Sequence, residues 1–321
     1  MNAPRTRVPR RPVHGVVLLD KPLGLSSNDA LQKVKWLLRA QKAGHTGTLD
    51  PLASGVLPLC FGAATKFSQL QLQAPKTYVA LARLGQTTTT ADAEGEVLRE
   101  QPVLPQMLQP EHLLWVQQQF TGAIQQVPPM YSALKKEGRA LYEYARAGLE
   151  VERAARDVTI HNLVICAAQD AQGLPALEIT VTCSKGTYIR TLAEDIGAVL
   201  GCGAHLRALR RIDSGGIEIA RCITLDALVA MDEHQRMLHV QPVDCLLHAH
   251  ARLELGQHDA GRFLSGLRRR GDWSDADAVA VYGCQPHALL GVGHVKSGEL
   301  IADRLLSPLE IQQILEGTPH P

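Results

Sequence analysis

The loop from Gly44 to Ser54 holds the group best suited to chemistry, because it places one carboxylate, Asp50, among glycines and hydroxyl side chains. Its glycines allow sharp bends or close approach to a ligand, since glycine has no Cβ and tolerates positive φ. Pro51 fixes its own φ and favours extended geometry at Asp50. We therefore predict that the loop presents this carboxylate on a stiff support. The alternative is an ordinary turn in which the aspartate bonds only its own backbone.

The cysteines and histidines predict neither a disulfide framework nor a metal site. The seven cysteines are odd in number, widely scattered and never in a Cys-x-x-Cys pair. Among the thirteen histidines, only His248 and His250 are close together, with no nearby third ligand of metal-site character. We therefore expect reduced thiols and a cytoplasmic location.

The charge distribution is more informative than the formal net charge of +1. Of the 33 basic and 32 acidic residues, 7 and 9 lie after Cys245, so the preceding part carries the positive excess. Some of its cations could form a face that binds successive phosphate groups, and others could simply end a helix. The candidates for this basic face, beside the N-terminal arginines, are Lys135, Lys136, Lys185, Arg190, Arg207, Arg210 and Arg211.

Length and composition predict a globular protein of about two domains. With 45% apolar and 20% charged residues, the chain has no run approaching the roughly 20 apolar residues that span a bilayer. Residues 1–12 contain four arginines and no acid, and we interpret them as a disordered basic arm. We place a large domain at residues 13–245 and a small β-rich domain at residues 246–315.

Local patterns predict an α+β fold with mixed or antiparallel strand pairing, because the βαβ rhythm of a doubly wound sheet is missing. A helix follows a cap at Ser26 or Ser27, and an amphipathic helix from Thr187 to Leu200 ends at Gly201. The predicted strands include residues 15–19, 55–61, 77–84, 151–173 and 176–183. After a turn, residues 97–100 are expected to pair back as a hairpin with residues 77–84.

Several separated segments together resemble TruB-type tRNA pseudouridine synthases of the bacterial kind. They include His-Thr-Gly-Thr-Leu-Asp-Pro in the Asp50 loop, and they occur in the family's order over nearly all of the chain up to Gly215. The segments are Gly15 to Asp29, Gly44 to Leu59, Lys76 to Tyr78, Pro128 to Lys135, Cys183 to Thr191 and Gly201 to Arg211. The resemblance implies a pseudouridine synthase catalytic domain followed by a small PUA-like domain.

The resemblance also implies the reaction. It is the isomerisation of uridine 55 in the T arm (TψC loop) of tRNA to pseudouridine, by base flipping and nucleophilic attack of Asp50, without cofactor or metal. Attack on uracil C6 and attack on ribose C1′ both remain open. The expected partner is tRNA, with no membrane, no obligatory protein partner and a monomeric state.

By the same resemblance, Arg190 pairs with Asp50 and keeps the carboxylate charged in a desolvated site. Tyr78 stacks on the extruded base, which compensates for stacking lost in the RNA. Tyr188 and Leu209 contact the flipped nucleotide, and Tyr188 also helps to remove the proton from C5.

Two further residues take supporting roles in this resemblance. His45 fills space left in the folded RNA loop, and Lys21 lies near the floor of the active site. The sequence departs from the family at Thr89, where an acid is often found, although Asp92 keeps its place. The PUA-like domain is inferred from its position after the catalytic domain and from its short segments with strand-like patterns.

Two other functions are compatible with parts of this pattern. A non-catalytic RNA-binding or tRNA-folding protein would need the aromatic and basic residues, but it would not need Asp50 paired with Arg190. A phosphate-binding nucleotide enzyme would need a Gly-Lys-Ser/Thr ending that the glycine loop lacks.

Overall fold

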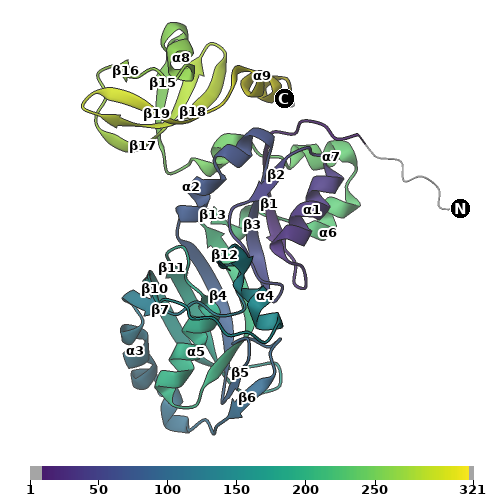
Figure 1. Cartoon of the computed structure of the whole chain (residues 1–321), viewed down its shortest axis with the longest axis vertical. Helices are drawn as coiled ribbons and strands as arrows, with labels where there is room; N and C mark the ends of the chain where they lie inside the picture. Colours follow the sequence, from purple (N-terminus) through teal and green to yellow (C-terminus); the bar gives the residue numbers. More distant parts are fainter. Residues whose placement is uncertain (1–8, 318–321) are drawn as a thin grey trace, which may run out of the picture.

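The computed structural model describes residues 9–317 and shows an elongated molecule with a small domain at one end of a larger one (Figure 1). Residues 1–8 of the predicted arm lie outside the described residues. Further along the arm, Arg11 donates its backbone N–H to Arg39 O at 2.8 Å and accepts from Gln41 N at 3.1 Å. Among residues 9–317, no helix is long and apolar enough to cross a membrane.

The large domain is built on a ten-stranded mixed sheet in the order β14-β1-β3-β12-β4-β11-β10-β7, with β13 on β12 and β2 on β3. β12 runs parallel to β3 and antiparallel to β4, so the α+β prediction with mixed pairing is confirmed. The strands are β1 (Gly15–Lys21), β2 (Ala43–His45), β3 (Ala53–Phe61), β4 (Lys76–Leu84), β7 (Gly122–Gln126), β10 (Arg156–Gln169), β11 (Pro175–Cys183), β12 (Ala204–Ser214), β13 (Ile217–Glu218) and β14 (Ile223–Thr224).

Two groups of helices cover this sheet and form separate apolar cores. α1 and α6 pack on β1 and β3, whereas α3 and α5 pack on β4, β10, β11 and β12. The helices of the large domain are α1 (Ser27–Leu37), α2 (Ser68–Gln73), α3 (Pro110–Gln119), α4 (Leu141–Arg146), α5 (Ile189–Leu200), α6 (Leu225–Ala230) and α7 (Glu233–Leu238). Short 3₁₀ turns are η1 (Gly62–Lys66), η2 (Pro105–Leu108), η3 (Ile219–Arg221) and η4 (Val243–Leu246).

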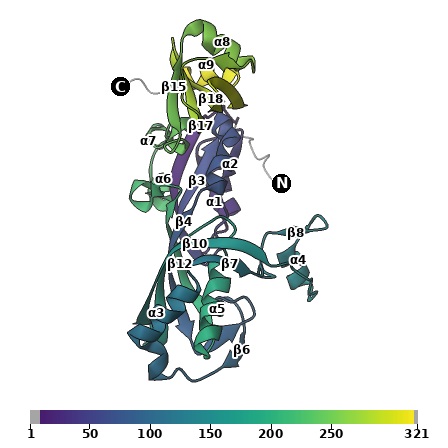
Figure 2. The ribbon, with the colours of Figure 1, turned by 90° about the vertical axis from the view of Figure 1, so that its left-hand side faces the viewer.

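The two helices with the clearest local signals are confirmed. Ser26 caps α1 by accepting a hydrogen bond from Asp29 N at 3.1 Å, and Gly201 ends α5 with φ at +85°. α4, with the small hairpin of β8 (Lys135–Lys136) and β9 (Arg139–Ala140), projects from the side of the sheet (Figure 2).

Two expectations about local structure are wrong. The arginines from Arg207 to Arg211 lie on β12, not at a helix end, because this segment fills the centre of the sheet between β3 and β4. The strand β6 (Val97–Glu100) pairs with β5 (Gln86–Thr88), not with β4. Gly85, with φ at +85°, turns the chain out of the main sheet before the hairpin begins.

The small domain is β-rich, as predicted. Its five-stranded sheet has the order β15-β17-β18-β19-β16. Its elements are β15 (Ala251–Leu255), α8 (Gln257–Leu264), β16 (Arg269–Arg270), β17 (Ala276–Cys284), β18 (His287–Lys296), β19 (Glu299–Leu305) and α9 (Pro308–Gly317). The domain boundaries and the PUA-like assignment stay predictions.

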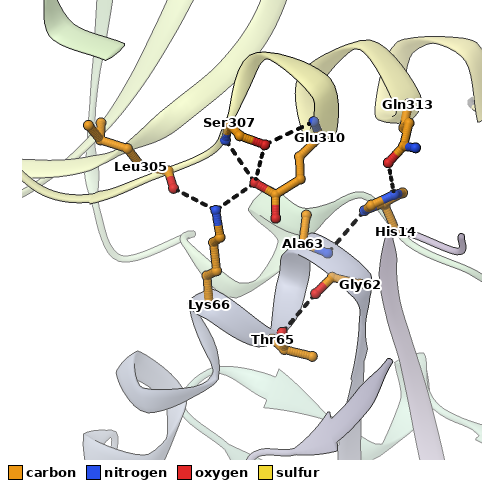
Figure 3. A network of polar contacts seen from close by, with 9 residues as sticks. All are labelled: His14, Gly62, Ala63, Thr65, Lys66, Leu305, Ser307, Glu310 and Gln313. Atoms are coloured by element: carbon orange, nitrogen blue, oxygen red, sulfur yellow. Dashed lines mark hydrogen bonds and ion pairs between the residues drawn. The ribbon is translucent and has the colours of Figure 1, made fainter. Parts of the chain in front are cut away.

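The small domain is attached to the large one by a packed interface (Figure 3). Lys66 Nζ in η1 donates to Leu305 O at 3.0 Å and pairs with Glu310 Oε2 at 2.5 Å. His14 Nδ1 accepts from Ala63 N at 3.0 Å, and its Nε2 lies 2.9 Å from Gln313 Oε1. Buried apolar residues of both domains form one continuous core beside these polar contacts.

Candidate active site

A pocket of about 420 Å³ opens where the Asp50 loop, β4, β12 and the beginning of α5 meet. It brings together residues that are far apart in the sequence. Five of the seven predicted site residues line it, and they are Asp50, Tyr78, Tyr188, Arg190 and Leu209.

The Asp50 loop is held by the helix that precedes it. Ser27, the first residue of α1, accepts a hydrogen bond from Leu49 N at 2.7 Å and donates one to Leu49 O at 3.1 Å. Because Ser27 is 1% exposed, these bonds are shielded from water. Asp50 O accepts from Ala53 N at 3.0 Å, so the loop does contain a turn. The carboxylate itself faces Arg190, not its own backbone, and its side chain is 40% exposed.

Arg190 is the fixed cation of the pocket. Its Nη2 lies 2.9 Å from Asp50 Oδ2 and its Nη1 lies 3.5 Å from Asp92 Oδ2. It also donates to Thr90 O at 3.2 Å and to Tyr131 O at 2.7 Å. With its side chain only 6% exposed, the guanidinium has one geometry and bridges two carboxylates.

Asp92 was not among the predicted site residues, although its place in the turn was noted. It is 3% exposed and accepts hydrogen bonds from Thr90 Oγ1 at 2.5 Å and Glu94 N at 3.1 Å. The only signal in the sequence was an acid in a turn rich in threonine. Its contact with Arg190 depends on how the turn of the hairpin after Gly85 docks beside β12, where Leu206 N donates to Ala91 O at 3.0 Å, and no local pattern specifies this.

The electrostatics of Asp50 reflect this crowded setting. Burial raises the pKa of Asp50, the Arg190 guanidinium opposes the rise, and the Asp92 charge adds to it. Lys21 lowers the same pKa through its charge. The surrounding cations therefore favour the ionised carboxylate that a nucleophile requires, whereas burial and Asp92 oppose it.

Tyr78 on β4 lies directly opposite Arg211 on β12. Arg211 is 1% exposed, and it donates to Val56 O at 2.7 Å and to Gly47 O at 3.3 Å. Burial raises the pKa of Tyr78, although Arg211 opposes this, so the phenol is neutral at pH 7. The uncharged Tyr78 ring, with the fixed Arg211 guanidinium opposite it, is suited to stacking on a base.

The prediction of an exposed basic face is wrong for two arginines, Arg190 and Arg211. Arg190 and Arg211 are buried in the pocket wall, where they fix backbone and carboxylate groups. Arg210 pairs with Asp20 at 2.7 Å but keeps its side chain 44% exposed, so its place in the basic face stays a prediction. The sequence around Arg210 and Arg211 could not show this, because successive residues face opposite sides of a sheet only once the segment is known to be a strand.

Tyr188 immediately precedes α5, and the buried Gln126 fixes its backbone. Tyr188 N donates to Gln126 Oε1 at 3.0 Å, and Gln126 Nε2 donates to Tyr188 O at 3.3 Å. Burial raises the pKa of Tyr188, so its phenol also stays protonated near neutral pH. Such a group can relay a proton but holds no negative charge before reaction.

Lys21 and His45 do not line the pocket. Lys21 is 0% exposed and donates to Pro22 O at 2.8 Å and Leu25 O at 2.6 Å. Burial lowers its pKa to about 8, against the opposing effect of Asp50. His45 Nδ1 accepts from Gly47 N at 3.4 Å, and burial lowers the pKa of its imidazole. Their predicted roles in binding stay predictions.

Comparison with known proteins gives matches over the whole chain. Residues 35–189 match the N-terminal domain of TruB family pseudouridylate synthases, and residues 190–248 match the C-terminal domain of tRNA pseudouridylate synthase B. The chain is 67% identical over 318 residues to tRNA pseudouridine synthase B of Verminephrobacter eiseniae, covering 99% of this chain and 96% of that one. The homologue from Ralstonia nicotianae is 55% identical, with 94% and 97% covered.

A solved structure agrees with this likeness. A chain in the crystal structure of a Cbf5–Nop10–Gar1 complex superposes with a TM-score of 0.64 at 28% sequence identity. The match covers 99% of this chain and 88% of that chain. The likeness therefore extends through both domains.

Proposed function

This chain belongs to the TruB family of tRNA pseudouridine synthases, and we propose from this premise that it isomerises uridine 55 in the T arm of tRNA to pseudouridine with Asp50 as the nucleophile. One observation carries the residue assignment. The half-exposed Asp50 carboxylate opens on the pocket while the buried Arg190 holds it at 2.9 Å.

The chemistry required matches these two groups. The ionised carboxylate attacks either ribose C1′ or uracil C6, the N1–C1′ bond breaks, and the uracil turns so that C5 bonds to C1′. In the first case C5 displaces the carboxylate from C1′, and in the second the bond between Asp50 and C6 breaks when the C5–C6 double bond forms again. In both cases N1 takes up one proton. The proton on C5 then leaves. Arg190 limits the cost of a desolvated anion and keeps its oxygen in one position. Tyr188 and Leu209 line the space in which the base turns.

Tyr78 supports base flipping in this proposal. A base removed from the RNA stack loses contacts on both faces, and an aromatic ring restores one of them. Stacking on an aromatic side chain is worth about 1 to 3 kcal/mol per base. That is comparable to the few kcal/mol that flipping costs, so the neutral Tyr78 ring can offset much of it.

The decisive experiment measures tritium release from tRNA labelled at uracil C5, together with mapping of the modified uridine. Asp50→Asn should abolish release while tRNA binding stays within about twofold, because the amide keeps its size but loses nucleophilicity. Asp157→Asn, which changes an exposed carboxylate on β10, is the matched control and should release tritium normally. Turnover by Asp50→Asn would remove Asp50 from the nucleophile role.

A protein that only binds or folds tRNA would release no tritium at all, and family membership does not favour it. We also propose that the enzyme acts in the cytoplasm as a monomer without an obligatory protein partner. Light scattering of the purified protein, with cell fractionation, checks these two statements.

A further inference from the structure

The C-terminal end of α1 carries an exposed tryptophan that the catalytic pocket does not use. Trp36 is 72% exposed, although indole rings bury much apolar surface in most folded proteins. A hollow of about 190 Å³ lies beside it. We call this the α1 patch, and its lining residues are Arg10, Gln32, Lys35, Trp36, Leu37, Arg39, Glu233 and Arg236.

The α1 patch is positively charged. Four of its lining residues are cations and one, Glu233, is an acid. Glu233 is already shared between Arg11 at 3.2 Å and Arg39 at 3.3 Å. Within residues 9–317, no carboxylate forms an ion pair with Lys35 or Arg10. Both cations therefore remain available to an anionic ligand.

The patch is also rigid and mechanically linked to the catalytic loop. Arg236 donates to Leu228 O at 2.8 Å and Val229 O at 2.9 Å, which joins α7 to the end of α6. At the other end of α1, Ser27 holds Leu49 beside the catalytic carboxylate. Trp36 lies nine positions after Ser27, so the patch is about 14 Å along the helix from that anchor.

An exposed aromatic ring flanked by unpaired cations has the chemistry of a site for unpaired RNA. The ring offers a face to any base, and the cations neutralise the flanking phosphates. The paired bases of an RNA stem are already stacked, so they cannot lie on the ring. A base that does so must come from an unpaired part of the RNA.

We propose that the α1 patch is a second RNA-binding site, which holds an unpaired nucleotide of tRNA from outside the T arm while uridine 55 occupies the pocket. The base stacks on Trp36, and its phosphates contact Lys35 and Arg10. This proposal rests on the proposed function, because it assumes that tRNA is the RNA in the pocket.

The test compares full-length unmodified tRNA with an isolated T-arm stem-loop. Trp36→Ala should weaken binding of full-length tRNA by about tenfold, as expected for one lost stacking contact, and leave stem-loop binding unchanged. Trp36→Phe should restore most of the affinity. Trp115→Ala, which removes an exposed tryptophan from α3, is the matched control and should bind both RNAs as the wild type does.

Two further measurements test RNA binding by the α1 patch independently of the pseudouridine synthase activity. In a Trp115→Phe, Trp273→Phe background, the remaining Trp36 fluorescence should be quenched by full-length tRNA and not by the stem-loop. Lys35→Gln should reduce the salt slope of full-length tRNA binding by about 0.7 to 0.9, the value for one phosphate contact.

The outcomes are distinct. Equal affinities of Trp36→Ala and wild type for full-length tRNA would overturn the α1 patch proposal, and tritium release would then still test the proposed function. Equal loss on both RNAs would also overturn it, because the site would then bind the T arm itself. Unquenched Trp36 fluorescence with normal tRNA binding would also overturn it, because the bound RNA would then not contact Trp36.

Discussion

At the scale of single residues, the site is organised by one guanidinium between two carboxylates. Arg190 contacts Asp50 and Asp92, and its two Nη nitrogens also donate to the backbone carbonyls of Thr90 and Tyr131. Burial raises the pKa of Asp50, the Arg190 charge lowers it, and the Asp92 charge adds a smaller rise. Asp92 therefore positions Arg190 at an electrostatic cost to the carboxylate that must ionise.

Substitution of Asp92 by asparagine tests this balance. Because the Asp92 charge raises the pKa of Asp50, its removal should lower that pKa and move the acidic limb of the kcat profile to lower pH. Turnover at neutral pH should fall, since Arg190 loses one anchor. Single-turnover tritium release between pH 5 and 9 measures both effects, with Glu94→Gln as the control in the same turn. A shift of the limb to higher pH would mean that Arg190 has left Asp50.

At the scale of elements, the sequence was sufficient to predict helices and strands where the signals were local. The ends of α1 and α5 follow from Ser26 and Gly201, because caps and apolar periodicity depend on neighbouring residues. β12 was missed, since its pairing with β3 and β4 is set by residues more than a hundred positions away. The same limit hid the Tyr78 and Arg211 pair, which a shift of register by one residue would separate.

In the candidate site too, some features could be predicted from the sequence and others could not. The Asp50 to Arg190 pairing came from the family resemblance, and the 2.9 Å contact agrees with it. The sequence offered Ser26 and Ser27 equally as the helix cap. The structure uses Ser26 for the cap, which leaves the buried Ser27 hydroxyl for Leu49. Adjacent serines with such different tasks cannot be told apart from spacing alone.

Substitutions of these two serines should therefore differ in effect. Ser27→Ala removes two buried hydrogen bonds, and we expect the free energy of unfolding to fall by about 1 to 3 kcal/mol. Turnover should fall with it, because the Asp50 loop loses its anchor. Ser26→Ala should cost about 0.5 to 2 kcal/mol as a lost cap and leave kcat unchanged. Urea unfolding and tritium release provide the comparison, and equal kcat in the two variants would show that Ser27 does not control the loop.

At the scale of the whole molecule, the small domain is continuous with the large one. Phe67 of the large domain and Leu300 of the small domain belong to one buried cluster, beside the polar contacts of Figure 3. Such an interface resists independent domain motion more than a linker does. An RNA bound across both domains would therefore meet a surface that is already arranged.

Glu310 provides the sharpest test of this rigidity. Burial tends to raise the pKa of its carboxyl, but the bonds from Lys66 and Ser307 outweigh burial and lower that pKa below its usual value. The unfolded chain therefore binds the proton more tightly, and the stabilising contribution of Glu310 is complete above its ordinary pKa of 4.5 and is lost as pH falls through the lower folded value. Glu310→Gln should remove about 1.5 to 3 kcal/mol, typical of a hydrogen bond to a charged group.

Hydrogen exchange of the α9 amides measures this loss. Exchange should be faster in Glu310→Gln at pH 7, and the acid-induced weakening of the interface that we expect in the wild type should be smaller in the variant. Glu316→Gln, which changes an exposed carboxylate on the same helix, should behave as the wild type does at both pH values. If α9 were equally protected in all three proteins, the buried apolar cluster alone would hold the domains together, and the ion pair between Lys66 and Glu310 would contribute nothing measurable to their arrangement.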